Sequence, residues 1–348
     1  MGVRDEWVVL DRIDPARLAH WMDAHGLAGQ GDLPRLSSIS GGSQNDLVGV
    51  DRGDVSMVLR MPTVDAPSER LKSFAREVRI LEALRDTDVP HPRLMASALD
   101  PDEIGLPFYL MERVDGWSVM QVGGWPAPFD GDIEARAYLA YELVEGAARL
   151  GRVDWRGRGL EGFGRPDGFH DRQVDRWLAF LEPIRTRPIP HLEAVAQWLR
   201  ANRPARYEPG VMHGDYSFAN VMFSHGTPAK LAAIVDWEMA TIGDPLLDVA
   251  WALMCWPPEG LDILARPPAD LTGMPSLDEL LAHYERLSGR STDNFQYSLV
   301  LARFKLGIVL EQSVFRHSRG LADDRVASWG PHVTNLIEKA GRLAGVVD

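Results

Sequence analysis

The sequence predicts an α+β fold of two lobes, a small lobe built on an antiparallel sheet and a larger, mostly helical lobe that follows it. Three observations lead to this expectation. Short apolar runs separated by turn signals fill the first third of the chain, and helical periodicity dominates from residue 133 onward. In addition, a chain of 348 residues can enclose a sizeable core in each lobe.

The small lobe begins with a pattern typical of a β-hairpin. The Gly-Gly-Ser run at residues 41–43 closes one end of it, and the Asp-Arg-Gly-Asp turn at residues 51–54 closes the other. A further apolar run, Phe-Tyr-Leu-Met, leads into a turn at residues 112–116. The strands predicted in this lobe cover residues 36–40, 46–50, 56–61 and 108–111.

The small lobe also contains one predicted helix, over residues 68–85. Its apolar residues are spaced for a single helix face, and the Pro-His-Pro run that follows ends the helical pattern. We place the connection between the lobes in the turn at residues 112–116. The small lobe then covers residues 1–113 and the larger lobe residues 114–348.

The larger lobe contains the remaining helical patterns, with three exceptions. Residues 117–132, rich in glycine and proline, are expected to form an irregular loop, and residues 210–216 a second loop. Residues 229–236 form a short apolar strand that ends on a carboxylate. The helices predicted in this lobe cover residues 133–150, 173–181, 192–201, 277–287 and 295–316.

Composition excludes several classes of function. With 37 basic and 50 acidic residues the net charge is −13, and no block of Lys or Arg is present, so a nucleic-acid partner is not expected. The lone cysteine, Cys255, allows neither an intramolecular disulfide nor a cysteine metal site. The charged first 15 residues do not resemble a signal peptide, and no apolar run is long enough to cross a membrane. We therefore expect a cytoplasmic protein without a membrane partner, while its oligomeric state stays open.

Two short motifs carry the chemistry. The first is His-Gly-Asp-Tyr-Ser-Phe-Ala-Asn at residues 213–220, and the second is Ile-Val-Asp-Trp-Glu at residues 234–238. Asp215, Asn220 and Asp236 form a sparse set of oxygen donors, which suits Mg²⁺ held by few protein ligands together with phosphate oxygens. Asp215 need not touch the metal, because it can accept the proton of an attacking hydroxyl while the other two hold the cation.

These motifs resemble those of the aminoglycoside phosphotransferase family, relatives of the protein kinases. The first motif stands where kinases have His-Arg-Asp and a following Asn, and Asp236-Trp-Glu stands where they have Asp-Phe-Gly. The Gly-Asp-Pro-Leu-Leu-Asp run at residues 243–248 also matches, and the resemblance extends from about Ile39 to Ala250.

The resemblance implies a protein-kinase-like bilobal fold and a small-molecule kinase that moves the γ-phosphoryl group of a nucleotide to a hydroxyl. ATP is the expected nucleotide, GTP is possible, and Mg²⁺ is the expected metal. Asp215 would be the catalytic base, and Asn220 and Asp236 would hold the metal. A nucleotide-binding pseudokinase scaffold is the alternative from another class. A protein kinase proper is disfavoured by the missing His-Arg-Asp, Asp-Phe-Gly and Ala-Pro-Glu set.

The resemblance also assigns the nucleotide contacts. Arg60 stands where kinases have a strand lysine, and it would pair with Glu77. The alternative is that Glu77 forms an exposed ion pair with a basic residue on the surface. The Glu112 carbonyl and the Val114 amide would face the base. The glycine turn is either a tight hairpin or a cover over the phosphates, and we favour the cover; it consists of Ser40, Gly41, Gly42 and Ser43.

Four further segments resemble a subgroup whose members are sometimes fused to acyl-CoA dehydrogenases; they cover residues 39–45, 58–62, 159–164 and 172–177. This subgroup favours a hydroxyacyl-CoA or a related metabolite as the acceptor, with an aminoglycoside as the alternative. Structural roles are expected for His213, Asp244 and Asp248. A place in the core is expected for five aromatic residues, Trp251, Trp256, Phe295, Phe304 and Phe315.

Overall fold

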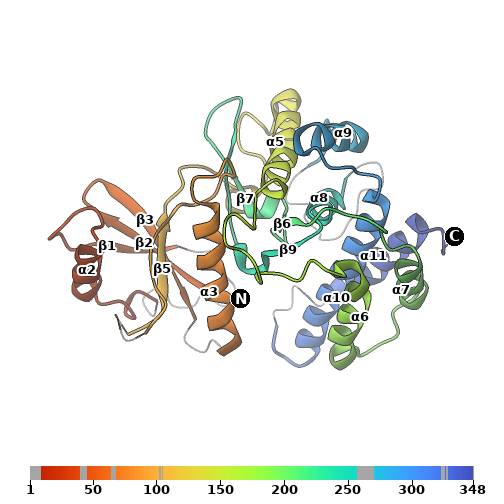
Figure 1. Ribbon diagram of the computed structural model, residues 1–348, viewed down its shortest axis with the longest axis horizontal. Coiled ribbons are helices and arrows are strands. Elements are labelled where there is room, and N and C mark those ends of the chain that lie inside the picture. Colours follow the sequence, from red (N-terminus) through yellow and green to blue (C-terminus); the bar gives the residue numbers. More distant parts are fainter. Residues whose placement is uncertain are drawn as a thin grey trace.

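The computed structural model describes residues 9–39, 45–63, 68–101, 103, 105–256, 270–322, 326 and 328–347, with the side chains of residues 68–70 left out. A small antiparallel sheet with its helices occupies one end of the molecule, and a larger helical lobe occupies the other (Figure 1). The predicted α+β architecture is therefore confirmed.

The small lobe is built on a five-stranded sheet of order β1-β2-β3-β5-β4, in which every neighbouring pair is antiparallel. Four strands agree with the sequence prediction, and β4 was missed because its Leu-Met-Ala-Ser-Ala sequence has no β-branched residue. The strands are β1 (Arg35–Ile39), β2 (Asn45–Arg52), β3 (Val55–Pro62), β4 (Leu94–Ala98) and β5 (Phe108–Glu112).

Two turns connect the first three strands. Arg52 pairs with Val55, so Gly53 and Asp54 form a two-residue hairpin loop between β2 and β3. Gly53 has a φ of +57°, a left-handed conformation that glycine adopts at little cost. The predicted glycine loop between β1 and β2, residues 40–43, lies outside the described residues.

Two helices cover opposite faces of this sheet. Helix α2 (Pro15–Ala24), which was not predicted, packs on one face together with the side chains of Leu59 and Met61. Helix α3 (Ser68–Leu84) packs on the other face. Because strand side chains alternate between faces, Arg60 points away from the α2 side and toward α3.

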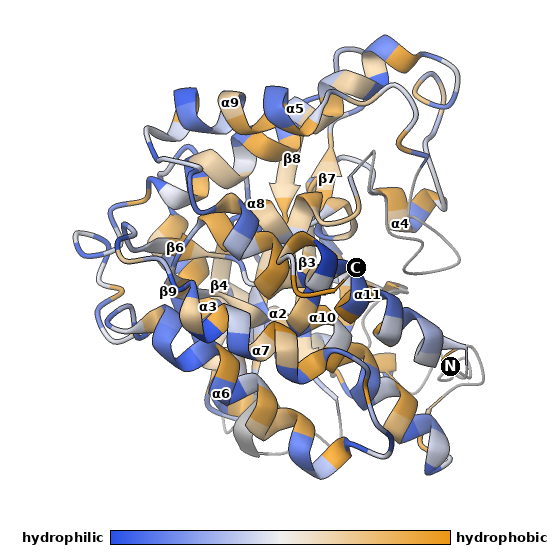
Figure 2. Ribbon diagram, turned by 90° about the vertical axis from the view of Figure 1, so that its right-hand side faces the viewer, coloured by the Kyte–Doolittle hydropathy of each residue, from blue (hydrophilic) through white to orange (hydrophobic). Residues whose placement is uncertain are grey.

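The described residues of the larger lobe contain the five helices that the sequence predicts and two more of at least eight residues, α8 and α11. Helix α10 packs against α6, α7, α8 and α11. Figure 2 shows hydrophilic and hydrophobic residues alternating along α6 and α11, as expected of helices with one buried face. The helices are α5 (Ile133–Gly151), α6 (Phe169–Leu181), α7 (Leu192–Ala201), α8 (Leu246–Leu253), α9 (Leu277–Ser288), α10 (Phe295–Ser318) and α11 (Trp329–Leu343).

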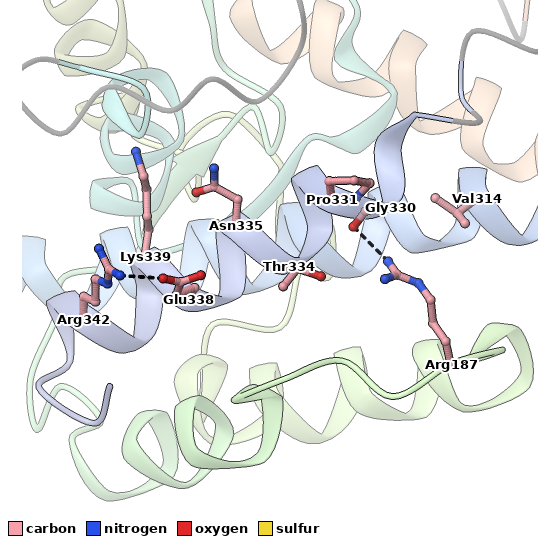
Figure 3. Close-up of a pocket in the computed structure, with 9 residues that line it drawn as sticks. All are labelled: Arg187, Val314, Gly330, Pro331, Thr334, Asn335, Glu338, Lys339 and Arg342. Carbon is pink, nitrogen blue, oxygen red and sulfur yellow. Dashed lines mark hydrogen bonds and ion pairs between the residues drawn. The ribbon is translucent and has the colours of Figure 1, made fainter. Parts of the chain in front are cut away.

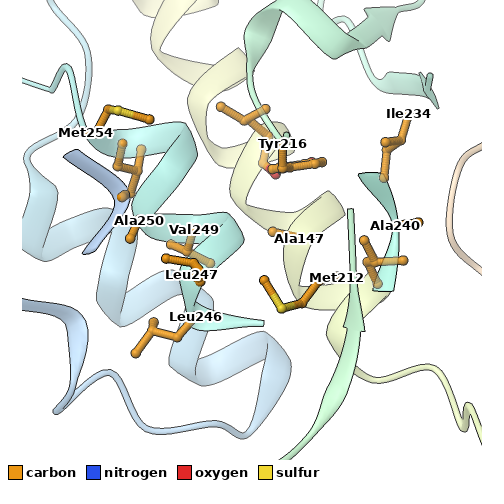
Figure 4. Packing of buried hydrophobic residues seen from close by; sticks show 14 of the residues in the cluster. Ala147, Met212, Tyr216, Ile234, Ala240, Leu246, Leu247, Val249, Ala250 and Met254 are labelled. Atoms are coloured by element: carbon orange, nitrogen blue, oxygen red, sulfur yellow. The ribbon is translucent and has the colours of Figure 1, made fainter. Parts of the chain in front are cut away.

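Two small two-stranded sheets lie between the lobes and position the catalytic segments. One pairs β6 (Gly210–Met212) with β9 (Thr241–Gly243), and the other pairs β7 (Val221–Phe223) with β8 (Leu231–Ile234). The predicted loop at residues 210–216 is thus wrong in its first half, because three residues pair with β9. Apolar side chains from β6, α5 and α8 pack beneath these segments (Figure 4).

The expected loop at residues 117–132 contains one short helix, α4 (Val119–Val122), whose N-terminus is capped by the Ser118 side chain. Across the described part of the chain, no helix has the length and apolar character needed to span a bilayer.

Candidate active site

Three polar side chains meet where the two small sheets end. Asp215 lies three residues after β6, Asn220 directly precedes β7, and Asp236 lies two residues after β8. Strands β7 and β8 are paired, and the Val235 amide donates a hydrogen bond to the Asn220 carbonyl at 2.9 Å. Segments far apart in the sequence therefore bring all three residues to one place.

Both carboxylate oxygens of Asp215 are held by fixed donors. The Asn220 side-chain amide donates to Oδ2 at 2.9 Å and to the Asp215 backbone carbonyl at 2.8 Å. The Trp251 indole N–H donates to Oδ1 at 2.8 Å. Burial raises the pKa of Asp215, whereas His213 and these two hydrogen bonds act to lower it. The result is an oriented carboxylate with a raised pKa, a property that suits a general base.

The catalytic loop is pinned by buried groups. Asp248 accepts the backbone N–H groups of His213 at 2.6 Å and of Gly214 at 2.9 Å. His213 in turn contacts the Val235 carbonyl through Nε2 at 2.9 Å and accepts the Asp215 amide at Nδ1. Gly214 has a φ of +87°, and a Cβ there would lie 2.5 Å from the Met239 carbonyl oxygen. The structural roles expected for His213 and Asp248 are confirmed.

Asp244 also has the structural role that was expected. Its Oδ1 accepts the amide of Leu246, the first residue of α8, at 3.1 Å, and its Oδ2 lies 2.9 Å from Nε2 of His170. These contacts join the end of β9 to α6 and α8.

Arg60 lies between two carboxylates. Its guanidinium is 2.9 Å from Glu77 and 3.0 Å from Asp236, and the Tyr109 hydroxyl donates to Glu77 at 3.0 Å. Burial acts to lower the pKa of Arg60, but Tyr109, Glu77 and Asp236 outweigh it and raise that pKa. The predicted Arg60–Glu77 pair is present, and the alternative of an exposed Glu77 is wrong because that side chain is 1% exposed.

Asp236 combines an unusual backbone with an accessible side chain. Its φ of +67° is rare for a residue other than glycine, and its carboxylate is 41% exposed. Since the Asn220 amide nitrogen is directed to Asp215, its Oδ1 atom remains as a second oxygen donor. Two such donors fit Mg²⁺, whose other ligands are commonly phosphate oxygens and water. Among the described residues, no group of three or more His, Cys, Asp or Glu side chains is placed to hold a metal ion, so a metal here would need ligands from elsewhere, such as Asn220, phosphate or water.

The connection between the lobes begins where β5 ends. The Glu112 side chain is exposed and lies 4.0 Å from Arg93, while its backbone amide donates to the Arg93 carbonyl at 2.9 Å. Val114 follows outside the sheet, and its amide has no hydrogen-bond acceptor in the described part of the protein. Backbone groups of this segment are thus available to a ligand, and the predicted contacts of Glu112 and Val114 with a base stay a prediction.

Two functional candidates were missed from the sequence. Trp251 is partly buried and packs against the core, as assigned, but its indole N–H also hydrogen-bonds Asp215, a role that was not expected. Its place three residues after Asp248, on the same face of α8, is the signal that could have found it. Lys305 of α10 is buried, with Nζ 5.0 Å from the ring centroid of Trp251 and 5.4 Å from that of Trp177. The core positions expected for Trp256, Phe295 and Phe304 are confirmed, and Phe315 is partly buried.

Two hollows differ in their relation to these residues. One, of about 770 Å³, adjoins the catalytic loop at Gly214 and extends along α6. The other, of about 720 Å³, lies against α11 (Figure 3) and contains no residue of the catalytic segments. In the second hollow Arg187 pairs with Glu311 at 2.8 Å and contacts the Gly330 carbonyl, and Arg342 pairs with Glu338 at 2.6 Å.

The sequence profile of the phosphotransferase enzyme family matches residues 35–287. The chain belongs to this family. The expected kinship with aminoglycoside phosphotransferases is thereby confirmed. Acyl-CoA dehydrogenase family member 11 of Gallus gallus is 31% identical over 293 residues, which are 81% of this chain and 37% of that protein. This chain spans about a third of the length of the curated relatives that it matches. The subgroup inferred from the sequence is the one that these relatives represent.

Solved structures confirm the kinase-like bilobal fold. A Ralstonia eutropha JMP134 protein, provisionally named an aminoglycoside phosphotransferase, superposes with a TM-score of 0.81 at 25% identity, covering 96% of this chain and 99% of that one. A thermostable aminoglycoside phosphotransferase APH(4)-Ia in complex with ADP and hygromycin B has a TM-score of 0.58 at 15% identity, covering 92% of this chain and 97% of that one.

Proposed function

We propose that this chain is a small-molecule kinase that transfers the γ-phosphoryl group of ATP, or of GTP, to a hydroxyl group, with Mg²⁺ as the metal. One observation carries the proposal. The Asp215 carboxylate, the oxygen donors of Asn220 and Asp236, and the Arg60–Glu77 pair all meet where the two lobes join.

Asp215 would orient the acceptor hydroxyl and accept its proton. Its two oxygens are fixed by Asn220 and Trp251, so little reorganisation is needed when the hydroxyl attacks. Burial raises the pKa of this carboxyl, which makes it a better proton acceptor than an exposed aspartate. Since phosphoryl transfer proceeds through a loose transition state, positioning supplies a large share of the acceleration.

Asn220 and Asp236 would hold the metal ion. When bound, Mg²⁺ neutralises the charge on the β- and γ-phosphate oxygens. The chain's own contribution is to fix these two donors. Asn220 is fixed by its bonds to Asp215, and one oxygen of Asp236 is fixed by Arg60 at 3.0 Å, which leaves the other oxygen for the cation.

Arg60, the glycine loop and the lobe connection would hold the nucleotide. The buried Arg60 guanidinium, oriented by Glu77, can donate to phosphate oxygens, as guanidinium groups commonly do. Backbone N–H groups of Ser40, Gly41, Gly42 and Ser43 would cover the phosphates. The backbone of Glu112 and Val114 would contact the base, and the ADP complex of a neighbour with the same fold supports nucleotide use at this joint.

The acceptor that we propose is a hydroxyacyl-CoA. Similarity to acyl-CoA dehydrogenase family members over most of this chain supports it, since a kinase portion in such proteins is expected to act on related acyl-CoA metabolites. An aminoglycoside acceptor is the rival, and the same experiment tests it. The cytoplasmic location expected from the composition stays a prediction.

The test is an acceptor panel with purified protein. The chain is incubated with Mg-ATP or Mg-GTP and with hydroxyacyl-CoA esters, aminoglycosides or simple alcohols, and products are read by mass spectrometry for one added phosphoryl group of about 80 Da. We expect the adduct on a hydroxyacyl-CoA, with none in the Asp215→Asn variant. Adducts on aminoglycosides would replace the proposed acceptor, and nucleotide binding without any adduct across the panel would favour a pseudokinase scaffold.

A further inference from the structure

The cavity beside the catalytic loop is lined by an excess of positive charge. Four arginines and one lysine line it, and Glu238 is the single carboxylate among its described lining residues. This is unexpected in a chain with a net charge of −13. The five cationic residues, which we call the cationic cluster, are Arg76, Arg165, Arg172, Arg176 and Lys305.

Asp215 and Asp248 attract Lys305 electrostatically, but the protein supplies the cationic cluster with few countercharges. Within the described ranges, none of its five side chains forms an ion pair with a carboxylate. Arg76 contacts the Ala240 carbonyl at 3.0 Å and stacks on the Phe163 ring at 4.1 Å, and Arg172 donates to the Arg165 carbonyl at 2.5 Å. Side-chain atoms of Arg165 and Arg176 have no hydrogen bond in this part of the structure. By contrast, Arg200 of the neighbouring helix α7 and Arg203, just after that helix, are paired with aspartates of α6.

Two of the segments that line the cavity lie outside the catalytic motifs, and the rest of the lining comes from α3, α10 and the segments around β6 and β9. Residues 162–165 form one wall, and the other is the face of α6 that carries residues 169, 172, 173, 176 and 177, at helical spacing. Both walls overlap the subgroup segments at residues 159–164 and 172–177 noted in the sequence. These two segments, which resemble the subgroup, therefore line one cavity.

The cavity adjoins the loop that carries Asp215. Gly214, directly before Asp215, is a lining residue. Lys305 lies under the Trp251 ring at 5.0 Å, and the same ring hydrogen-bonds Asp215. A ligand in the cavity would therefore lie beside the loop that carries Asp215.

We propose that this cavity binds the phosphate groups of the acceptor, as a subsite of the proposed kinase that selects phosphate-bearing hydroxyl compounds. The inference rests on the proposed function, because it takes the bound compound to be the acceptor of that kinase. A guanidinium group can donate two parallel hydrogen bonds to a phosphate. A polyanion also reduces the mutual repulsion of the five cations more than the single carboxylate among the described lining residues does. A polycationic aminoglycoside would be repelled here.

The lysine adds support of its own. Burial lowers the pKa of Lys305 to about 8, because its charged form is desolvated between two indole rings. Asp248 and Asp215 offset part of this cost, and a bound phosphate would offset more of it.

The test uses the full chain and a double variant, Arg165→Gln with Arg176→Gln. Both side chains are exposed and hold no other part of the protein in place, so the variant should fold. The matched control is Arg200→Gln with Arg203→Gln, which removes two arginines just outside the cavity. We measure KM for a hydroxyacyl-CoA and for the corresponding pantetheine ester, which carries no phosphate.

The double variant should raise KM for the CoA ester about 30-fold, since two charge-assisted hydrogen bonds are lost. KM for the pantetheine ester, KM for Mg-ATP and kcat should stay unchanged, as should all values in the control. An equal rise in KM for both esters, or none for either, would overturn the subsite.

A binding experiment separates failure of the subsite from failure of the proposed function. Inorganic pyrophosphate is titrated calorimetrically into the protein saturated with Mg-ADP, and tricarballylate is titrated in parallel. Pyrophosphate binding that the double variant loses and the control keeps would support the phosphate site even if no acceptor were phosphorylated. Absence of pyrophosphate binding, or equal binding of tricarballylate, would contradict it.

Discussion

The two hollows described above are similar in volume and both are lined by several cationic side chains. They differ in whether those side chains form ion pairs with carboxylates. Against α11, Arg187 and Arg342 each face a glutamate, so the charges are compensated inside the protein. Along α6, the cationic cluster has no carboxylate in ion-pair contact among the described residues. Ion-paired charges stabilise the fold. Unpaired cations in a cavity are unfavourable, and a bound anionic ligand would relieve their repulsion.

This comparison assigns different consequences to chemically similar substitutions. Removing an arginine from the α11 hollow should change stability and leave catalysis alone. Removing one from the α6 cavity should do the reverse. The following experiments test that contrast, beginning with the largest expected effect.

The Arg187→Ala variant should be the most damaging to stability. Glu311, its partner at 2.8 Å, is 0% exposed, so the substitution leaves a buried carboxylate without its countercharge. We expect a loss of about 3 kcal/mol in the free energy of unfolding, measured by urea denaturation, with KM for the acceptor unchanged. A loss below about 0.5 kcal/mol would show that the two hollows do not differ as described.

The Lys305→Met variant should instead be more stable than the natural protein near neutral pH. The pKa of Lys305 falls from 10.5 in the unfolded chain to about 8 in the folded one, so the folded state disfavours its charged form. That cost, about 3 kcal/mol, is complete below pH 8, shrinks as the pH rises and is gone above about 10.5.

The advantage of Lys305→Met should therefore disappear in alkaline buffer, as measured by denaturant midpoints across pH. Exposed Lys72, changed to Met, is the control and should show no such trend. An advantage for Lys305→Met that does not depend on pH would point to packing in place of the buried charge.

The Trp251→Phe variant should affect the pH profile of turnover. The indole N–H helps to lower the pKa of Asp215, against the effect of burial, so its loss raises that pKa further. The acidic limb of the kcat/KM profile should move to higher pH, and kcat should fall about tenfold through poorer orientation of the base. A lower kcat with an unmoved acidic limb would mean that Trp251 serves packing alone. Trp256→Phe, at a core position away from Asp215, is the matched control.

The smallest effect belongs to Arg165→Gln with Arg176→Gln. Because neither side chain is paired, the free energy of unfolding should change by less than about 0.5 kcal/mol. Thermal melts of the double variant and of the natural protein should coincide. A large loss of stability would show that these arginines are structural, and the contrast with Arg187 would fail.

The sequence predicted what depends on local pattern. Strands β1, β2, β3 and β5 and five helices of the larger lobe follow from apolar periodicity, whereas Glu77 was identified as the partner of Arg60 through the resemblance to kinases. The meeting of Asp215, Asn220 and Asp236 was predicted because their motifs are ordered and short.

The remaining features depend on contacts between distant segments. The spacing on α8 marks Trp251 as a neighbour of Asp248, but it does not show that Trp251 reaches Asp215 across 36 residues or that Lys305 joins them from another helix. The α6 cavity likewise needs the fold to bring Arg76 of α3 near residues 162–165. Helix α11 could have been predicted from the sequence, because its buried apolar residues recur at helical spacing; they are Val333, Leu336, Ile337 and Ala340.

The most direct test of the account compares binding with turnover in two variants. The claim is that Asp215 acts on the acceptor while Asp236 acts through the metal. Calorimetry of Mg-ATP should give an unchanged Kd for Asp215→Asn, whose turnover falls at least about 100-fold, and no Mg²⁺-dependent binding for Asp236→Ala. Loss of nucleotide affinity in a folded Asp215→Asn protein, or unchanged Mg-ATP affinity in Asp236→Ala, would contradict the proposed division of roles.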